Sequence, residues 1–163
     1  MIKQFTCEAF CLECRGCCRF SQEDSVWLPY LLKEEEGALL KAKGVGSISY
    51  QKIYPVRSKN EDGFLCPFLG VSRNKCGIYL QRPFECQLYP FLLNSSQGRV
   101  YLAQDPHCPY LKEKEGSNEL KEYIDCLIAF INSPAQLKII QNNLKIIHEY
   151  PGVENIAKLD MVI

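Results

Sequence analysis

Ten of the 163 residues are cysteines, and a dense group of them lies near the N-terminus. Cys11, Cys14 and Cys17 have the spacing C-x2-C-x2-C, and Cys18 follows directly. Three-residue spacing within a turn can bring successive sulfurs toward one point, and thiolates are soft anionic ligands that suit zinc and iron–sulfur clusters. Because the side chains of neighbouring residues diverge, Cys17 and Cys18 are not expected to bind the same single ion. The pattern predicts a metal site.

The cellular compartment decides whether so many cysteines bind metal or form disulfides. No apolar run typical of a signal peptide follows the first residues, and no stretch approaches the length of about 18 apolar residues that spans a membrane. We therefore expect a cytoplasmic protein whose thiols stay reduced and bind metal or take part in catalysis. A disulfide framework remains the alternative, because ten is an even number.

Four further cysteines stand beside residues that stiffen the chain. Cys66 and Cys108 each precede a proline, which favours extended geometry in the residue before it and so helps to present the thiol from a turn. Cys76 and Cys86 bracket the segment GIYLQRPFE. Each of the four could be a small buried hydrophobic residue, but together with the N-terminal group they are predicted to be ligands. Cys126 lies in the apolar helical segment IDCLIAF and is expected to pack in the core.

The spacing favours an iron–sulfur cluster over a single structural zinc ion. Bacterial ferredoxins use C-x2-C-x2-C-x3-C-P, and the first three cysteines of the N-terminal group match that run. Cys18 does not stand at the fourth spacing, but a remote Cys-Pro at Cys66 or Cys108 can complete the set. A zinc ribbon needs two C-x2-C knuckles, and the second is missing because nine residues separate Cys76 from Cys86. A [4Fe–4S] cluster is therefore the favoured cofactor, with zinc or iron ions as the alternative.

Three cysteine-containing segments follow one another along the chain: CLECRGCC, CPFL and CGIYLQRPFECQLYP. In this order they resemble the CxxCxxCC (YkgJ-like) family of zinc- or iron-chelating cysteine-cluster proteins, over roughly residues 7–110. The resemblance implies metal chelation in a family whose functions are largely unknown. A flagellin lysine methylase has a similar cluster, so a metal-dependent enzyme related to lysine methylases is an alternative, although this chain is short for that enzyme. The ligands implied by the resemblance are Cys11, Cys14, Cys17, Cys18, Cys66, Cys76, Cys86 and Cys108.

Two residues near these cysteines are expected to support a cofactor. A cluster held by four thiolates is anionic, and the guanidinium of Arg82 can neutralise it and donate to sulfur; a surface ion pair is the alternative role. Tyr79 is expected to wall the site from water, unless it belongs to an aromatic core. His107 beside Cys108 suggests a Cys–His nucleophile or an imidazole ligand, but no third orienting group is evident, so we assign no catalytic residue.

A small, irregular, metal-organised α+β domain is expected to position these residues. Residues 1–20 are predicted to form turns, and residues 23–43 contain a helix that Pro29 starts or interrupts. The acidic run KEEEG within that helix is expected to be a solvated face. The segment YPFLLNSSQGRVYLAQ predicts a short β-hairpin, because two apolar runs flank a polar turn that contains Asn94, Ser95, Ser96 and Gly98.

The cysteine-free end of the chain predicts a helical hairpin over residues 117–150. Apolar residues recur at helical spacing in NELKEYIDCLIAFIN and in the following segment. In the second helix, Ser133 is predicted to be the N-cap, Pro134 the first helical residue and Gln136 the capping-box partner. One domain is expected to span residues 1–163, with the cysteine-cluster body at 7–110.

Composition narrows the function further. The 19 basic and 19 acidic residues balance, which argues against nucleic acid as a partner, because phosphate binding needs a surplus of Lys and Arg. We expect a metal-binding protein with a redox or cofactor-support role, of oxidoreductase-like character. The alternative from another class is a structural zinc module that binds a protein partner.

Overall fold

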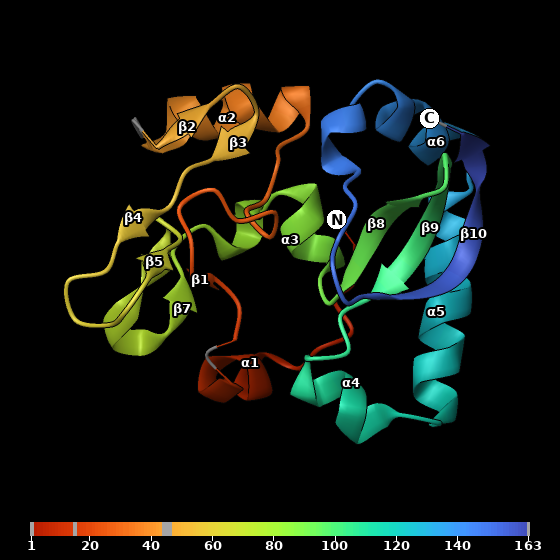
Figure 1. Ribbon diagram of the computed structural model, residues 1–163, viewed down its shortest axis with the longest axis horizontal. Helices are drawn as coiled ribbons and strands as arrows, with labels where there is room; N and C mark the ends of the chain where they lie inside the picture. The colour runs from red at the N-terminus through yellow and green to blue at the C-terminus, as the bar shows by residue number, and fades with distance from the viewer. Residues whose placement is uncertain (1, 15, 44–46, 163) are drawn as a thin grey trace. The chain divides into compact units, whose positions relative to one another are not determined.

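The computed structural model describes residues 2–14, 16–43 and 47–162. Helices and short antiparallel sheets both occur, which confirms the α+β class (Figure 1). The chain forms two compact units: Cys7–Gln87 make the cysteine-rich unit, while Met1–Thr6 join Leu88–Ile163 in the C-terminal unit. That the two units belong to one domain stays a prediction. No helix among the described residues is long and apolar enough to span a bilayer.

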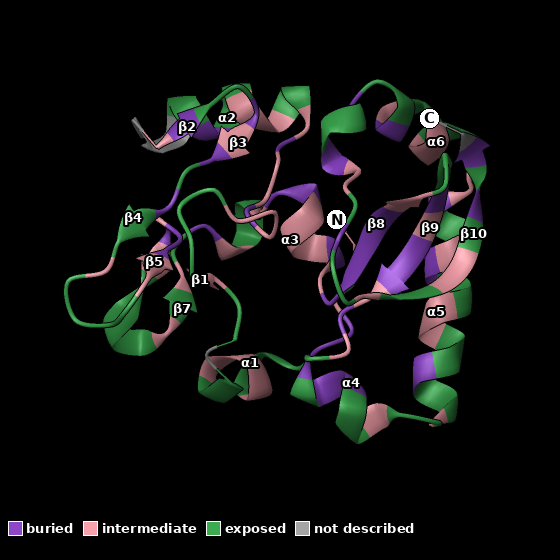
Figure 2. Cartoon of the chain, viewed as in Figure 1, coloured by how far each residue is buried: buried purple, intermediate pink, exposed green. Residues whose placement is uncertain are grey.

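The C-terminal unit is built on a three-stranded antiparallel sheet. The strands β8 (Phe91–Ser96), β9 (Arg99–Gln104) and β10 (Glu154–Val162) have the order β10-β9-β8. The predicted hairpin is thus confirmed as β8 and β9, and Figure 2 shows both strands largely buried. The third strand, β10, was not expected from the sequence.

The turn of the hairpin is tighter than expected. Gln97 and Gly98 both have positive φ, 51° and 70°, as a two-residue hairpin turn with a twist matching its strands requires. Asn94, predicted for the turn, lies in β8 instead and is buried. Its amide donates to Asn155 Oδ1 at 2.8 Å and its oxygen accepts from Tyr150 N at 2.9 Å, so the polar side chain serves the core rather than a turn.

Three helices follow β9 in the chain: α4 (Pro109–Lys114), α5 (Asn118–Ile131) and α6 (Pro134–Gln141). The predicted N-cap and first residue of α6 are confirmed, since Ser133 accepts a hydrogen bond from Gln136 N and Pro134 stands at the start, whereas Ser133 N donates to Phe130 O and the capping-box role of the Gln136 side chain stays a prediction. The helix was expected to reach residue 150, which is wrong. It ends at Gln141 because the Asn143 side chain bonds back to Ile139 O at 2.9 Å, and a 3-10 turn (Leu144–Ile146) follows.

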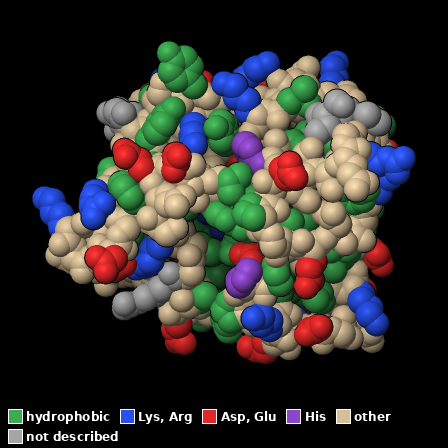
Figure 3. Space-filling view, viewed as in Figure 1, with side chains coloured by type: hydrophobic (Ala, Val, Ile, Leu, Met, Phe, Trp, Pro, Cys, Tyr) green, Lys and Arg blue, Asp and Glu red, His purple; other side chains and the backbone are tan. Residues whose placement is uncertain are grey.

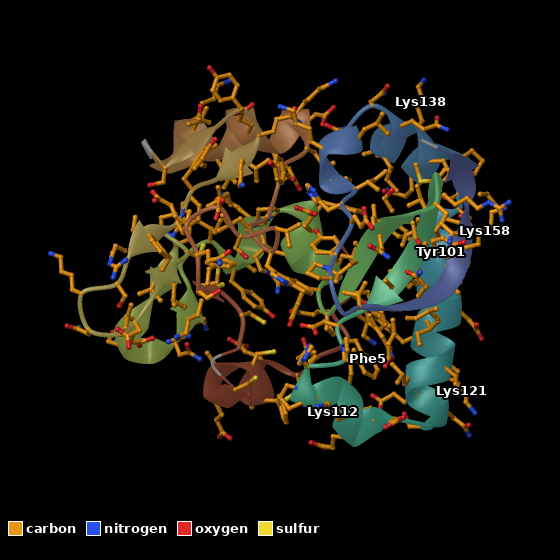
Figure 4. The ribbon with its side chains drawn as sticks, viewed as in Figure 1. Phe5, Tyr101, Lys112, Lys121, Lys138 and Lys158 are labelled. Carbon is orange, nitrogen blue, oxygen red and sulfur yellow. The ribbon has the colours of Figure 1, made fainter. Side chains whose placement is uncertain are left out.

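The first residues of the chain belong to the C-terminal unit. Phe5 is buried, and its ring centroid lies 5.0 Å from that of Tyr123, 5.5 Å from Tyr110 and 6.4 Å from Phe91 (Figure 4). The Tyr123 hydroxyl also donates to Lys3 O at 2.8 Å. These contacts make the N-terminal segment part of an aromatic core.

The cysteine-rich unit is assembled from very short elements. Its helices are α1 (Glu8–Cys14), α2 (Lys33–Lys43) and α3 (Phe84–Leu88), joined by the 3-10 turns Val71–Arg73 and Tyr79–Gln81. Helix α1 corrects the expectation that residues 1–20 form turns. Every strand has two residues: β1 (Arg19–Phe20), β5 (Phe64–Leu65) and β4 (Val56–Arg57) in one sheet, β2 (Ile48–Ser49) with β3 (Lys52–Ile53), and β6 (Leu69–Gly70) with β7 (Lys75–Cys76).

The acidic run of α2 is only partly a solvated face, which corrects the sequence-based expectation. Glu35 accepts from Leu32 N at 2.9 Å and from Phe84 N at 2.8 Å, so one carboxylate joins the starts of α2 and α3. Glu36 accepts from Gln51 N at 2.8 Å. Backbone donors that lack a helical partner explain why these acids turn inward. Elsewhere on the face drawn in Figure 3, acidic and basic side chains are interspersed.

Candidate metal centre

Cys18 and Cys66 meet where β1 pairs with β5. The Cys66 amide donates to Cys18 O at 2.9 Å, and Cys18 has a positive φ of 64°, which is uncommon for a residue other than glycine. Their thiols are also hydrogen-bonded to each other. This contact lowers the pKa of Cys18 and raises the pKa of Cys66, which is the buried member of the pair. Two sulfurs that are 48 positions apart by residue number (66 minus 18) are therefore neighbours.

The β6–β7 hairpin brings a third thiol to the same place. Cys76 lies opposite Leu69 in the ladder, and Leu69 N donates to Cys66 O at 3.0 Å. Gly77 N donates to Phe68 O at 2.8 Å, and a Cβ on Gly77 would lie only 3.2 Å from that oxygen, so glycine allows this close approach. Burial raises the pKa of the Cys76 thiol, and the charge of a Cys18 thiolate raises it further.

Helix α3 supplies the fourth thiol, that of Cys86. Burial raises the pKa of Cys86 well above its usual range, and negative charge on Cys18 acts in the same direction. The pKa of Cys66 is likewise raised, chiefly by Cys18 and burial and to a smaller extent by Cys86. Four thiols from distant parts of the chain thus share one electrostatic environment, and we call Cys18, Cys66, Cys76 and Cys86 the thiol group.

Apolar side chains surround the thiol group. Cys66 belongs to the hydrophobic cluster of the cysteine-rich unit, and Cys18 and Cys76 pack against that cluster. An apolar shell excludes water and lowers the local dielectric, which favours a neutralised, metal-bound form of the thiols over separate thiolates. The other buried residues of this cluster are Leu31, Leu39, Ile48, Ile53, Phe68 and Ile78.

Arg82 supplies positive charge to the thiol group. Burial raises the pKa of Cys76 and Cys86, and the Arg82 guanidinium acts against that effect on both; it also contributes to the lowered pKa of Cys18, after the larger effect of Cys66. Tyr79 holds this guanidinium, because Arg82 Nε donates to Tyr79 O at 3.0 Å and the guanidinium carbon lies 3.9 Å from the ring centroid. Arg82 and Tyr79 therefore act as a pair.

The N-terminal cysteines lie on or beside helix α1. Cys7 O accepts from Cys11 N at 3.1 Å, so Cys7, Cys11 and Cys14 follow one helix face at intervals of four and three residues. Cys11 is partly buried, whereas Cys14 and Cys17 are exposed. Among the described side chains, no three Cys, His, Asp or Glu residues form a group that could hold an ion as they stand.

Asn74 is a residue of this region that the sequence did not single out. Its amide nitrogen donates to Leu12 O at 2.6 Å and to Cys11 O at 3.4 Å, while its oxygen accepts from Arg19 Nη1 at 2.8 Å. The residue has a φ of 48°, a conformation that Asn tolerates better than most side chains. That tolerance was the one signal in the sequence that pointed to it.

The remaining candidates lie in the C-terminal unit. Cys108 is buried, precedes α4, and donates its amide to Asp105 O at 3.1 Å. Asp105 is the orienting group that the sequence did not reveal for His107: its Oδ1 lies 3.1 Å from His107 Nδ1, and its Oδ2 accepts from the Tyr89 hydroxyl at 2.7 Å. Cys126 was expected to be buried and is exposed, because it faces outward from α5.

The chemistry of the donors fits a thiophilic metal. All ten cysteines lie within the described residues, and none of them is joined in a disulfide. Four thiols beside an apolar cluster, with the guanidinium groups of Arg19 and Arg82 to balance their charge, suit zinc or an iron–sulfur cluster better than a hard cation, which requires oxygen ligands. Donors of this kind are those that cysteine-ligated metal proteins use.

Comparison with known families agrees with this class. The model of the CxxCxxCC family, described as a "putative zinc- or iron-chelating domain", matches residues 10–109, which is more than half of the chain. The protein belongs to this family. The match supports metal-ion binding and includes all eight cysteines predicted as ligands, whereas Cys7 and Cys126 fall outside it. No solved structure gave a significant match.

Proposed function

We propose that the cysteine-rich unit holds zinc or iron through Cys18, Cys66, Cys76 and Cys86. The observation that carries this proposal is the placement of Cys66 in the apolar cluster with Cys18 and Cys76 packed against it. The direction in which Cys18 shifts the pKa values of Cys66, Cys76 and Cys86 agrees with that placement. Thiols that repel one another as anions release that repulsion when they share a cation. The free energy of metal binding then also stabilises the folded state of the unit.

An iron–sulfur cluster is the form of the centre that we favour, with a redox or cofactor-support role. The C-x2-C-x2-C run matches the start of the ferredoxin pattern, and Cys66 is a remote Cys-Pro of the kind that completes it. When bound, such a cluster stores and transfers single electrons. The apolar shell and the Arg82 charge would then tune its reduction potential. In this proposal Cys11, Cys14 and Cys17, which belong to the same unit, extend the ligand set.

A structural zinc module that binds a protein partner is the second candidate. Its support is the shortness of the elements, since every strand of the cysteine-rich unit has two residues. Strands of that length bury little surface, and small domains of this kind commonly rely on a metal for stability. In this role the metal substitutes for missing core and takes no part in electron transfer.

Elemental analysis of protein purified without oxygen tests both candidates. We expect iron and acid-labile sulfide in comparable amounts, with visible absorbance that bleaches on reduction by dithionite. Colourless protein with stoichiometric zinc would contradict the iron–sulfur form and support the zinc module. Protein that takes up neither metal after reconstitution would refute the proposed function as a whole.

Serine substitutions test the ligand assignment. Cys66→Ser and Cys86→Ser should each lose most of the bound metal and unfold at lower temperature, because they remove thiols from the shared environment. Cys126→Ser is the matched control, since Cys126 is exposed in the other unit. Equal metal content in all three variants would show that the thiol group is not the centre.

A further inference from the structure

Helix α1 is a short element that carries two of the predicted ligands. It has seven residues and no buried one, so its own sequence cannot keep it helical or fix its place. Its position must therefore come from contacts with the rest of the cysteine-rich unit. Two contacts come from neighbouring residues of the β6–β7 hairpin, Asn74 and Lys75.

The two contacts differ in strength. Lys75 Nζ lies 2.8 Å from Glu8 Oε1, but both side chains are about half exposed, and an exposed ion pair contributes little. Asn74 is partly buried and donates to the carbonyls of Leu12 and Cys11 at 2.6 and 3.4 Å. Carbonyls in the last turn of a helix have no partner within it, so this amide completes the end of α1.

The oxygen of the same side chain binds the segment that carries Cys18. Asn74 Oδ1 accepts from Arg19 Nη1 at 2.8 Å, and Arg19 follows Cys18 in the chain. Arg19 is fixed in turn by Glu61, whose Oε2 lies 3.0 Å from its Nε. Asn74 also stands two residues before Cys76. One side chain thus joins the three segments that carry Cys11, Cys18 and Cys76.

We propose that Asn74 is a positioning residue that places the thiols of α1 and the following turn against the metal held by the thiol group. The inference rests on the proposed function and adds to it the way in which the exposed N-terminal cysteines are brought to the metal. Without the amide, α1 loses its fixed end, and Cys14 and Cys17 no longer meet the metal. Asn suits this role because its side chain donates and accepts at once and its backbone tolerates a positive φ.

Alkylation of individual cysteines tests this role in the full-length protein. Zinc-loaded and zinc-free samples are treated with iodoacetamide, and mass spectrometry follows the modification of each thiol. In the wild type we expect zinc to slow the modification of Cys11, Cys14 and Cys17, as well as that of Cys66 and Cys86. In Asn74→Asp the acceptor toward Arg19 remains and the donor to α1 is lost, so protection of the first three should fall about tenfold or more.

Two further variants keep the test decisive. Asn74→Gly retains the positive φ and removes the amide, and should match Asn74→Asp. Asn60→Asp places the same charge change at an exposed asparagine of the same unit and should behave like the wild type. Cobalt absorbance gives an independent readout, because the thiolate-to-metal bands should weaken in both Asn74 variants and stay unchanged in Asn60→Asp.

Each contrary result has a distinct meaning. Unchanged protection of Cys14 and Cys17 in both Asn74 variants would overturn the inference, and so would a wild type in which zinc protects only Cys66 and Cys86, although the proposed function would stand. Loss of protection at all cysteines in both Asn74 variants would assign Asn74 to folding and overturn its positioning role. Zinc that protects no cysteine in the wild type would overturn inference and proposed function together.

Discussion

The guanidinium carbon of Arg82 lies 3.9 Å from the ring centroid of Tyr79, while Arg82 Nε donates to the Tyr79 carbonyl at 3.0 Å. A cation–π contact and a hydrogen bond to one residue thus hold the charge in place. A third contact, from Gln87 Nε2 to Arg82 O at 2.7 Å, fixes the backbone as well. The charge is therefore prearranged beside the thiols, and no reorganisation is needed when a metal binds.

Removing this charge should weaken metal binding. Arg82→Gln removes the guanidinium that acts on Cys76 and Cys86 and one of the two that act on Cys18, so the thiols give up their protons to a metal less readily. We expect the apparent zinc affinity at neutral pH to fall by about tenfold for each unit by which a ligand pKa rises. Competition with a chromophoric chelator measures this affinity.

Two variants complete the Arg82 experiment. Arg73→Gln removes an exposed arginine of the same unit and should leave the affinity unchanged. Arg82→Lys keeps the charge but loses the planar stacking on Tyr79, so it should be intermediate. An Arg82→Gln affinity equal to that of Arg73→Gln would contradict the prediction, because it would show that the Arg82 charge has no effect on metal binding.

Glu35 gives the cysteine-rich unit a predictable pH dependence. Burial raises the pKa of its carboxyl, although Leu32 N and Phe84 N donate to it and oppose that rise. A group whose pKa is higher in the folded state stabilises the fold fully below its unfolded pKa, and that contribution is lost as the pH rises through the folded pKa. The stability of the unit should therefore decline from this source above about pH 4.5, the ordinary value for Glu.

Glu35→Gln should remove that decline. The variant stays neutral at every pH, so its free energy of unfolding should improve relative to the wild type as the pH rises, on top of a constant loss from the altered hydrogen bonds. Urea titrations of metal-free protein between pH 4 and pH 7 would measure the difference. Glu23→Gln, at an exposed position of the same unit, is the control, because Glu23 does not affect the pKa of Glu35. A difference that does not change with pH would contradict the prediction.

The sequence predicted the fold where the signals are local. The β8–β9 hairpin follows from two apolar runs around Gly98, and the start of α6 follows from Ser133 and Pro134. Strand β10 was missed because its register is set by β9, about fifty residues earlier in the chain. Non-local pairing leaves no such mark at one place in a sequence.

The site shows the same limit. Spacing marked the cysteines as ligands, and adjacency predicted that Cys17 and Cys18 diverge, but the sequence did not say that Cys18 is the one in the thiol group while Cys17 is exposed. Both residues lie in one turn, and the positive φ of Cys18 directs the two side chains apart. Asn74 and Asp105 were missed because each acts through contacts with residues that the chain brings close only when it folds.

Substitutions of Cys126 can test whether this side chain is exposed, as in the structure, or buried, as the sequence predicted. Its place in an apolar helical segment predicted core packing, whereas it is exposed on α5. Cys126→Ala should then change the free energy of unfolding by no more than about 0.5 kcal/mol, as is usual for surface positions. Leu127→Ala, at the buried neighbouring position, should cost about 2–5 kcal/mol. Chemical denaturation of both variants compares them, and a larger cost for Cys126→Ala would restore the sequence-based assignment.

Phe5 should hold the N-terminal segment in the C-terminal unit. Its ring is buried among Phe91, Tyr110 and Tyr123, so Phe5→Ala leaves a cavity and removes aromatic contacts. We expect the C-terminal unit to lose about 3–5 kcal/mol of stability, with a matching loss of the near-ultraviolet circular dichroism that ordered Tyr side chains produce. Phe130→Ala removes a ring of the same size that is 38% exposed in the same unit, and should cost much less. If Phe5→Ala and Phe130→Ala lost the same amount of stability, the first residues would not be part of this core.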